Sequence, residues 1–129
     1  MHKSRLGGFI IDCDTDDLQA AADFWAKALG APAKDEADLS VSPYVELNMP
    51  ADEPYVEVQK VDHASRVHID IESDDVDAEV TRLEDLGAKR IAGIRSFVVL
   101  EAPTGQRFCV VPVVSADFAD KAHIWNDED

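Results

Sequence analysis

The chain has 129 residues, a typical length for one domain, and 27 acidic against 12 basic side chains give it a formal net charge of −15. This acidity disfavours nucleic acids and anionic membranes as partners. The sequence contains no apolar run of about 18 residues and no basic-then-apolar amino terminus, so we expect neither a membrane span nor secretion, but a cytoplasmic protein.

The first half of the chain is predicted to form a strand, a helix and three further strands. Residues 6–13 alternate in polarity as a strand does. A helix follows, in which apolar residues recur at helical spacing: Leu18, Ala21, Ala22, Trp25 and Leu29. Asp16 or Asp17 can accept hydrogen bonds from its first amides, and Gly30 can take the left-handed conformation that ends it. Further strands are predicted at residues 44–48 and 55–61, with a weaker one near 38–41.

The second half of the chain repeats this order. Residues 67–76 match residues 9–18 in pattern, and each helix-like stretch closes on Leu-Gly-Ala, at 29–31 and at 86–88. Strands are predicted at residues 67–72, 89–92, 96–101 and 108–113, and Pro103-Thr104-Gly105 turns the last two into a hairpin. A duplicated unit buries its apolar face against its twin, and a site tends to form in the groove between the copies.

We therefore predict an α+β fold in a single domain, residues 1–129. Two βαβββ modules, residues 6–61 and 62–113, would be related by a pseudo-two-fold axis. They would form a curved mixed sheet around a cleft, with the helices outside. The tail at residues 114–129 is predicted to be a short helix or a partly disordered acidic end.

This arrangement resembles the vicinal oxygen chelate superfamily, which includes glyoxalase I, bleomycin-resistance proteins and ring-cleaving dioxygenases. The residues that carry the resemblance are Asp17-Leu18, Phe24-Trp25 and Leu29-Gly30, then Val67-His68-Ile69-Asp70-Ile71 with Asp74-Asp75-Val76, and Pro103-Thr104-Gly105-Gln106. The resemblance covers residues 6–113 and is closest to the glyoxalase-like and bleomycin-resistance-type domains. It implies the fold more strongly than the function, because this fold hosts many chemistries.

Polar side chains are predicted to share one face of several strands. Alternation places His68, Asp70 and Glu72 on one face of their strand, and Tyr55 and Glu57 on one face of theirs. If two such sheets curl toward each other, the ligand-binding residues would line one cavity: Asp12, Tyr55, Glu57, His68 and Asp70. The carboxylates of this set, with that of Glu72, suit a cationic ligand.

The metal-dependent branch of the superfamily takes one ligand from the first strand and one from the last strand of each module. The resemblance places these ligands at Ile10, Glu57, His68 and Cys109. Ile10 cannot bind a metal, and Cys109 stands where a carboxylate is expected, so we expect no metal cofactor. If a divalent metal is bound, Glu57, His68 and Cys109 would hold it. Cys109 is equally compatible with a small core residue.

Two functions remain open. The first is a non-catalytic protein of the bleomycin-resistance kind that binds a small-molecule ligand in a polar, acidic cleft. The second is a lyase or isomerase of the glyoxalase I type that uses a divalent metal, or His68 as the catalytic base. His68 could equally be a hydrogen-bonded residue of the pocket wall. The resemblance also implies a homodimer, because superfamily members commonly pair modules between chains, and Phe97, Phe108 and Val110 would offer apolar surface for this pairing.

Overall fold

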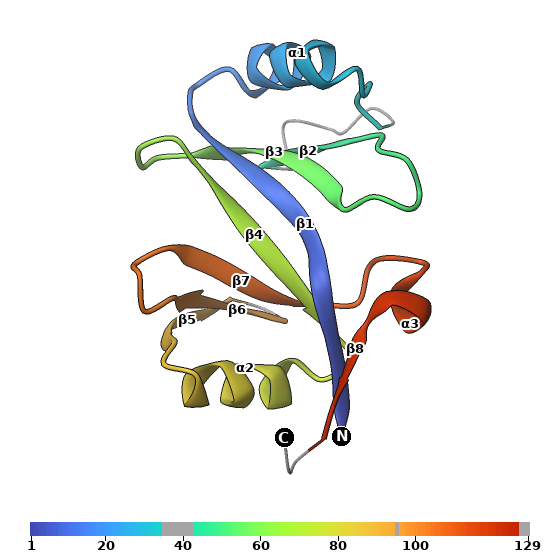
Figure 1. The fold of residues 1–129 in the computed structure, drawn as a ribbon. Helices are drawn as coiled ribbons and strands as arrows, with labels where there is room; N and C mark the ends of the chain where they lie inside the picture. Colours follow the sequence, from blue (N-terminus) through green and yellow to red (C-terminus); the bar gives the residue numbers. More distant parts are fainter. Residues whose placement is uncertain (35–42, 95, 127–129) are drawn as a thin grey trace. The chain divides into compact units, whose positions relative to one another are not determined.

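The computed structural model describes residues 1–34, 43–94 and 96–126. The chain divides into two compact units, each of which carries one long helix over strands of a mixed sheet (Figure 1). Unit I consists of residues 8–68, and unit II consists of residues 1–7 together with 69–129. The long strands β1 (His2–Asp14) and β4 (Arg66–Ser73) each contribute residues to both units. None of the helices in the described part of the chain could span a membrane.

Unit I is built from β1, α1 (Leu18–Leu29), β2 (Tyr44–Leu47) and β3 (Tyr55–Val61). β3 pairs in parallel with β1 and antiparallel with β2. The helix begins at Asp17, whose carboxylate accepts a hydrogen bond from the Ala20 amide at 3.0 Å, and it ends at Gly30, whose φ is 68°. A core cluster joins the helix to the sheet and includes Leu18, Ala22, Ile11, Val45, Leu47, Val56 and Val58.

Unit II repeats this plan with α2 (Val76–Asp85), β5 (Lys89–Ile94), β6 (Phe97–Glu101) and β7 (Arg107–Pro112). β4 and β7 are parallel, while β6 pairs antiparallel with both β5 and β7. Asp75 caps α2 by accepting from the Ala78 amide at 3.0 Å. The core cluster of this unit contains Val80, Val98, Leu100, Phe108 and Val110. Phe108 and Val110 are therefore core residues and do not provide the apolar surface that was expected to support a homodimer.

The carboxyl-terminal segment returns to the start of the chain within unit II. It forms α3 (Phe118–Lys121) and β8 (His123–Trp125), and β8 pairs antiparallel with residues 2–4 of β1. The indole of Trp125 donates a hydrogen bond to the Ser4 hydroxyl at 2.7 Å. The predicted short helix is therefore present, and a strand that was not predicted follows it.

The predicted α+β class and order of elements are confirmed. The second copy shows the full βαβββ order, and the first shows βαββ in the described residues. The strand predicted near residues 38–41 lies outside those residues. β1 begins at His2 rather than at residue 6 because β8 supplies a pairing partner for its first residues.

Candidate functional site

Asp12 and His68 form a hydrogen-bonded pair in unit I. The side chain of Asp12 on β1 is 2% exposed, and that of His68 on β4 is 13% exposed. Nδ1 of His68 lies 2.6 Å from Oδ2 of Asp12. Because a carboxylate oxygen accepts, Nδ1 carries the hydrogen, and Nε2 is the nitrogen through which the ring would act on a ligand.

The second oxygen of this carboxylate is not satisfied. Oδ1 of Asp12 is buried and has no hydrogen-bond partner in the described part of the chain. Buried polar atoms in folded proteins are nearly always paired, with protein atoms or with ordered water. Oε1 of Glu72 is buried and unpaired in the same way among the described residues, so this feature makes Asp12 a candidate functional residue only together with its contact to His68.

Arg66 approaches the same carboxylate from β4. Its Nε lies 3.8 Å from Oδ2 of Asp12, and its side chain is 48% exposed. A terminal nitrogen of Arg66 lies 3.3 Å from Nε2 of His63, and Nδ1 of His63 lies 2.9 Å from the Ala64 carbonyl oxygen. A guanidinium only donates, so Nε2 of His63 accepts and Nδ1 donates to Ala64. With this arrangement of hydrogens His63 is uncharged, so it orients Arg66 without offsetting the positive charge of the guanidinium.

The face of the unit I sheet opposite α1, here called the open face because α1 does not cover it, carries Gly8, Ile10 and Asp12 from β1, and all three are buried. Because Ile11, Val56 and Val58 pack toward α1, alternation turns their neighbours to this face. The β1–β3 register pairs Gly8 with Tyr55, Ile10 with Glu57, and Asp12 with Gln59. A Cβ on Gly8 would collide with the ring and main-chain oxygen of Tyr55, so glycine permits this close approach. The open face therefore places Tyr55, Glu57 and the buried Asp12 on neighbouring strands.

The predicted residues Asp70, Cys109 and Glu72 belong to unit II. Asp70 on β4 and Cys109 on β7 are register partners, and Asp70 is buried. Glu72 is fully buried, and its Oε2 accepts from the amides of Val114 at 2.5 Å and Ser115 at 2.8 Å. These contacts give Glu72 a structural role in fixing the path of the chain after β7.

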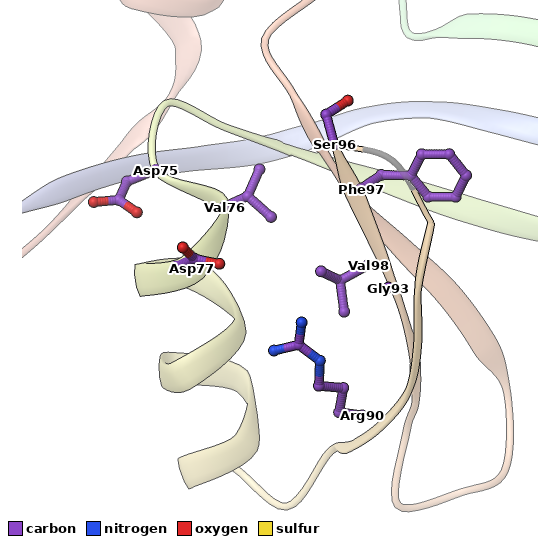
Figure 2. Close-up of a pocket in the computed structure, with 8 residues that line it drawn as sticks. All are labelled: Asp75, Val76, Asp77, Arg90, Gly93, Ser96, Phe97 and Val98. Carbon is purple, nitrogen blue, oxygen red and sulfur yellow. The ribbon is translucent and has the colours of Figure 1, made fainter.

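Cavities lie elsewhere in both units. One of about 490 Å³ lies in unit I beside the turns that follow β1 and β3, and His63 contributes to its wall. Another of about 320 Å³ lies in unit II between the start of α2 and the β5–β6 strands; in Figure 2, the side chains of Val76, Val98 and Arg90 point toward it. Neither cavity is lined by Asp12 or His68. The cavity in unit I is nevertheless linked to the site, because His63 also binds Arg66.

Cys13 lies beside Asp12 in sequence but packs on the α1 side of the sheet. Burial raises the pKa of its thiol, the negative charge of Asp12 raises it further, and a hydrogen bond with Trp25 opposes both. A thiol with a raised pKa is a poor nucleophile. Cys13 is thus a core residue rather than a reactive one.

The residues of unit I do not supply the metal site that the superfamily implies. Ile10, the register partner of Glu57, has no donor atom, so only Glu57 and His68 remain in unit I of the positions that the superfamily implies. A catalytic metal site needs about three protein ligands that converge. We therefore assign no step of the function to a metal.

Comparison with known protein families identifies the family to which this chain belongs. The model of the glyoxalase-like domain family matches residues 9–111. A comparison with curated protein sequences gives no significant match.

Several solved structures share the fold. A hypothetical protein from Bacillus halodurans has a TM-score of 0.64 at 13% identity, with 86% of this chain and 95% of that chain covered. A methylmalonyl-CoA epimerase in complex with methylmalonyl-CoA has a TM-score of 0.58 at 19% identity, with 90% and 97% covered. The epimerase of Streptomyces coelicolor has a TM-score of 0.58 at 18% identity, with 85% and 97% covered. At these identities the likeness establishes the fold and not the activity.

Proposed function

Because this chain belongs to the glyoxalase-like domain family of the vicinal oxygen chelate superfamily, we propose that it binds a small organic molecule at the open face of unit I. The observation that carries the proposal is the hydrogen bond between His68 and the buried Asp12. A buried carboxylate fixes the tautomer and orientation of an imidazole and so prepares Nε2 for one defined contact. Tyr55 and Glu57 would complete the ligand-binding surface.

A second candidate function is proton transfer of the lyase or isomerase type, with His68 as the general base. The same hydrogen bond supports it, because a buried carboxylate stabilises the imidazolium that forms when the ring takes a proton. The epimerases with the same fold act on a CoA ester by their titles. For this chain we propose only the class of reaction, removal of a proton next to a carbonyl.

The binding proposal can be tested by a thermal-shift screen of small organic molecules. A ligand that prefers the native state raises the melting temperature. We expect hits on the wild type that are lost in His68→Ala and weakened in Asp12→Asn. Asp14→Asn changes an exposed carboxylate on the same strand and should retain them. Hits that survive His68→Ala unchanged would place the binding surface elsewhere.

The two candidates are separated by hydrogen exchange in the ligand. Each hit that carries a carbonyl is incubated with protein in D₂O, and NMR follows loss of the signal of the adjacent C–H. Exchange that disappears in His68→Ala indicates proton transfer. Binding without exchange indicates a binding protein.

A further inference from the structure

We propose that the cavity of unit II binds a small aliphatic amino acid, whose carboxylate contacts Arg90 and whose ammonium group contacts Asp77. The cavity has a volume of about 320 Å³ and lies between the start of α2 and the β5–β6 strands (Figure 2). Pockets for small molecules begin at roughly 300 Å³, so this cavity suits a small ligand. The inference goes beyond the proposed function, because the residues that line this cavity take no part in the site of unit I.

A β-bulge in β5 turns Arg90 and Gly93 to the same face of the sheet. Arg90 pairs with Leu100 on β6, and Gly93 pairs with Val98. Leu100 and Val98 both belong to the core cluster that packs against α2. Residues directly opposite in an antiparallel pair share a face, so Arg90 and Gly93 lie on the face that the helix covers. Residues three apart in a regular strand would point to opposite faces, but the register shifts between Arg90 and Ala92.

The absence of a side chain at Gly93 leaves room for the guanidinium of Arg90. A Cβ on Gly93 would lie 3.5 Å from a terminal nitrogen of Arg90. In Figure 2 the side chain of Arg90 points into the space between α2 and the sheet. Among the residues that the structure describes, Arg90 forms no hydrogen bond or ion pair through its side chain. Its guanidinium can therefore bind a carboxylate through two parallel hydrogen bonds.

The second charge at this cavity is the carboxylate of Asp77, in the first turn of α2. Asp75 also lines the cavity, but its carboxylate caps the helix by accepting from the Ala78 amide. The side chain of Asp77 has no hydrogen bond or ion pair within the described part of the chain, so it is not paired with Arg90. A ligand that carries both charges can bind the two residues at once. The formal net charge of −15 repels an anion, whereas a zwitterion has no net charge and is not repelled.

Apolar side chains also line the cavity. Val98 is 5% exposed, and Val76 and Phe97 are half-buried. Burying an apolar part of the ligand against these residues is favourable. We therefore expect an aliphatic amino acid to bind more tightly than glycine.

Isothermal titration at neutral pH with three matched probes tests this assignment. L-Leucine carries both charges, 4-methylpentanoate lacks the ammonium group, and 3-methylbutylamine lacks the carboxylate. We expect leucine to bind the wild type about tenfold or more tighter than either analogue, because hydrogen bonds to charged groups contribute factors of this size. Arg90→Gln should remove the preference for leucine over the amine. Asp77→Asn should remove the preference for leucine over the acid.

A blocking variant and two control variants accompany these measurements. Gly93→Val places a side chain in the cavity without changing any charge and should abolish the binding of leucine. Gly93 is not among the glycines with a positive φ, so its backbone accepts valine. Arg107→Gln and Asp85→Asn remove exposed charges of unit II that do not line the cavity, and they should leave the affinity unchanged. A thermal melt of each variant confirms that it is folded, and if Gly93→Val does not fold, the two charge variants decide.

Three outcomes would overturn the proposal. Leucine binding that is unchanged in Arg90→Gln and in Gly93→Val would place the ligand elsewhere. Tighter binding of 4-methylpentanoate than of leucine would indicate a site for simple anions rather than for a zwitterion. The absence of leucine binding at millimolar concentration would exclude the amino acid as the ligand. None of these results bears on the site of unit I, because every variant leaves its residues unchanged.

Discussion

The carboxylate of Glu79 on α2 gives the sharpest test of the packing in unit II. Glu79 is fully buried, and both of its oxygens are bonded to Arg82, each at 2.8 Å. Oε1 also lies 2.8 Å from Nε2 of His2 on β1. The guanidinium of Arg82 in turn lies 3.8 Å from the ring centre of Trp125 on β8. One carboxylate therefore ties together the first strand, the second helix and the last strand.

Glu79→Gln keeps the shape of the side chain and removes its charge. The amide offers one oxygen to three donors, and its NH₂ group would face an N–H of Arg82. Leaving a donor unsatisfied in a buried site costs about 1–3 kcal/mol, and breaking a buried ion pair costs about 3–5 kcal/mol. Arg82 is 24% exposed and can recover part of this by binding water. We therefore expect the free energy of unfolding to fall by about 2–3 kcal/mol.

The measurement is urea denaturation of both proteins across a pH series. Burial has the largest effect on Glu79 and would raise its pKa, but hydrogen bonds from Arg82 and His2 outweigh it, so the pKa lies below the ordinary value of 4.5. A depressed pKa contributes stability above the unfolded value, and that stability is lost as the pH falls through the folded value. The difference between the two proteins should be constant at neutral pH and shrink below about pH 4.5.

Glu84→Gln is the matched control, since it removes an exposed carboxylate from the same helix. It should change stability by less than about 0.5 kcal/mol. If Glu79→Gln loses no more than Glu84→Gln, the buried ion pair does not stabilise the fold. If the difference instead grows as the pH falls, the assignment of the pKa shift is wrong.

Three further predictions concern packing, metal and association. Gly8→Ala should destabilise the protein by about 1–3 kcal/mol because its Cβ meets Tyr55, whereas Gly93→Ala, which meets only the end of Arg90 at 3.5 Å, should be milder in the same denaturation assay. Purified protein should hold no stoichiometric divalent ion after dialysis, and one zinc, nickel or iron per chain by elemental analysis, lost in His68→Ala, would contradict this. On the resemblance to the superfamily we also expect a homodimer, which a monomer mass by light scattering across micromolar concentrations would refute.

Local patterns in the sequence predicted much of the fold. The caps at Asp17 and Gly30 and the apolar spacing of α1 act within a few residues, so the sequence alone could locate the helix. Alternation likewise located β3 at its observed bounds. β8 escaped prediction because it has only three residues, and pairing with the start of β1 decides it.

The sequence indicated Asp12 and His68 as candidate site residues but did not indicate the contact between them. Asp12 and His68 were both assigned to polar strand faces, yet their hydrogen bond joins residues 56 positions apart. Alternation fixes which way a side chain leaves its strand, but it cannot say which strand lies opposite. Arg66 was missed because the strand was predicted to begin one residue later, although extending the alternation back from His68 would have found it. Glu72 appeared to be a ligand contact because the amides that bind it belong to the chain after β7.

The repeated sequence also explains why one ligand per chain is the natural expectation. At the offset that matches the two copies, Gly8 and Ile10 of β1 correspond to Arg66 and His68 of β4. The first copy thus has a small and an apolar residue where the second has a cation and an imidazole. Gly8 and Ile10 offer no side-chain donor or acceptor, so the first copy cannot bind a polar group through these two positions. The carboxylate that this copy does contribute, Asp12, holds His68 instead. In the proposed site the two strands would therefore have complementary roles, and we expect a titration of this chain with the ligand of that site to saturate at one ligand.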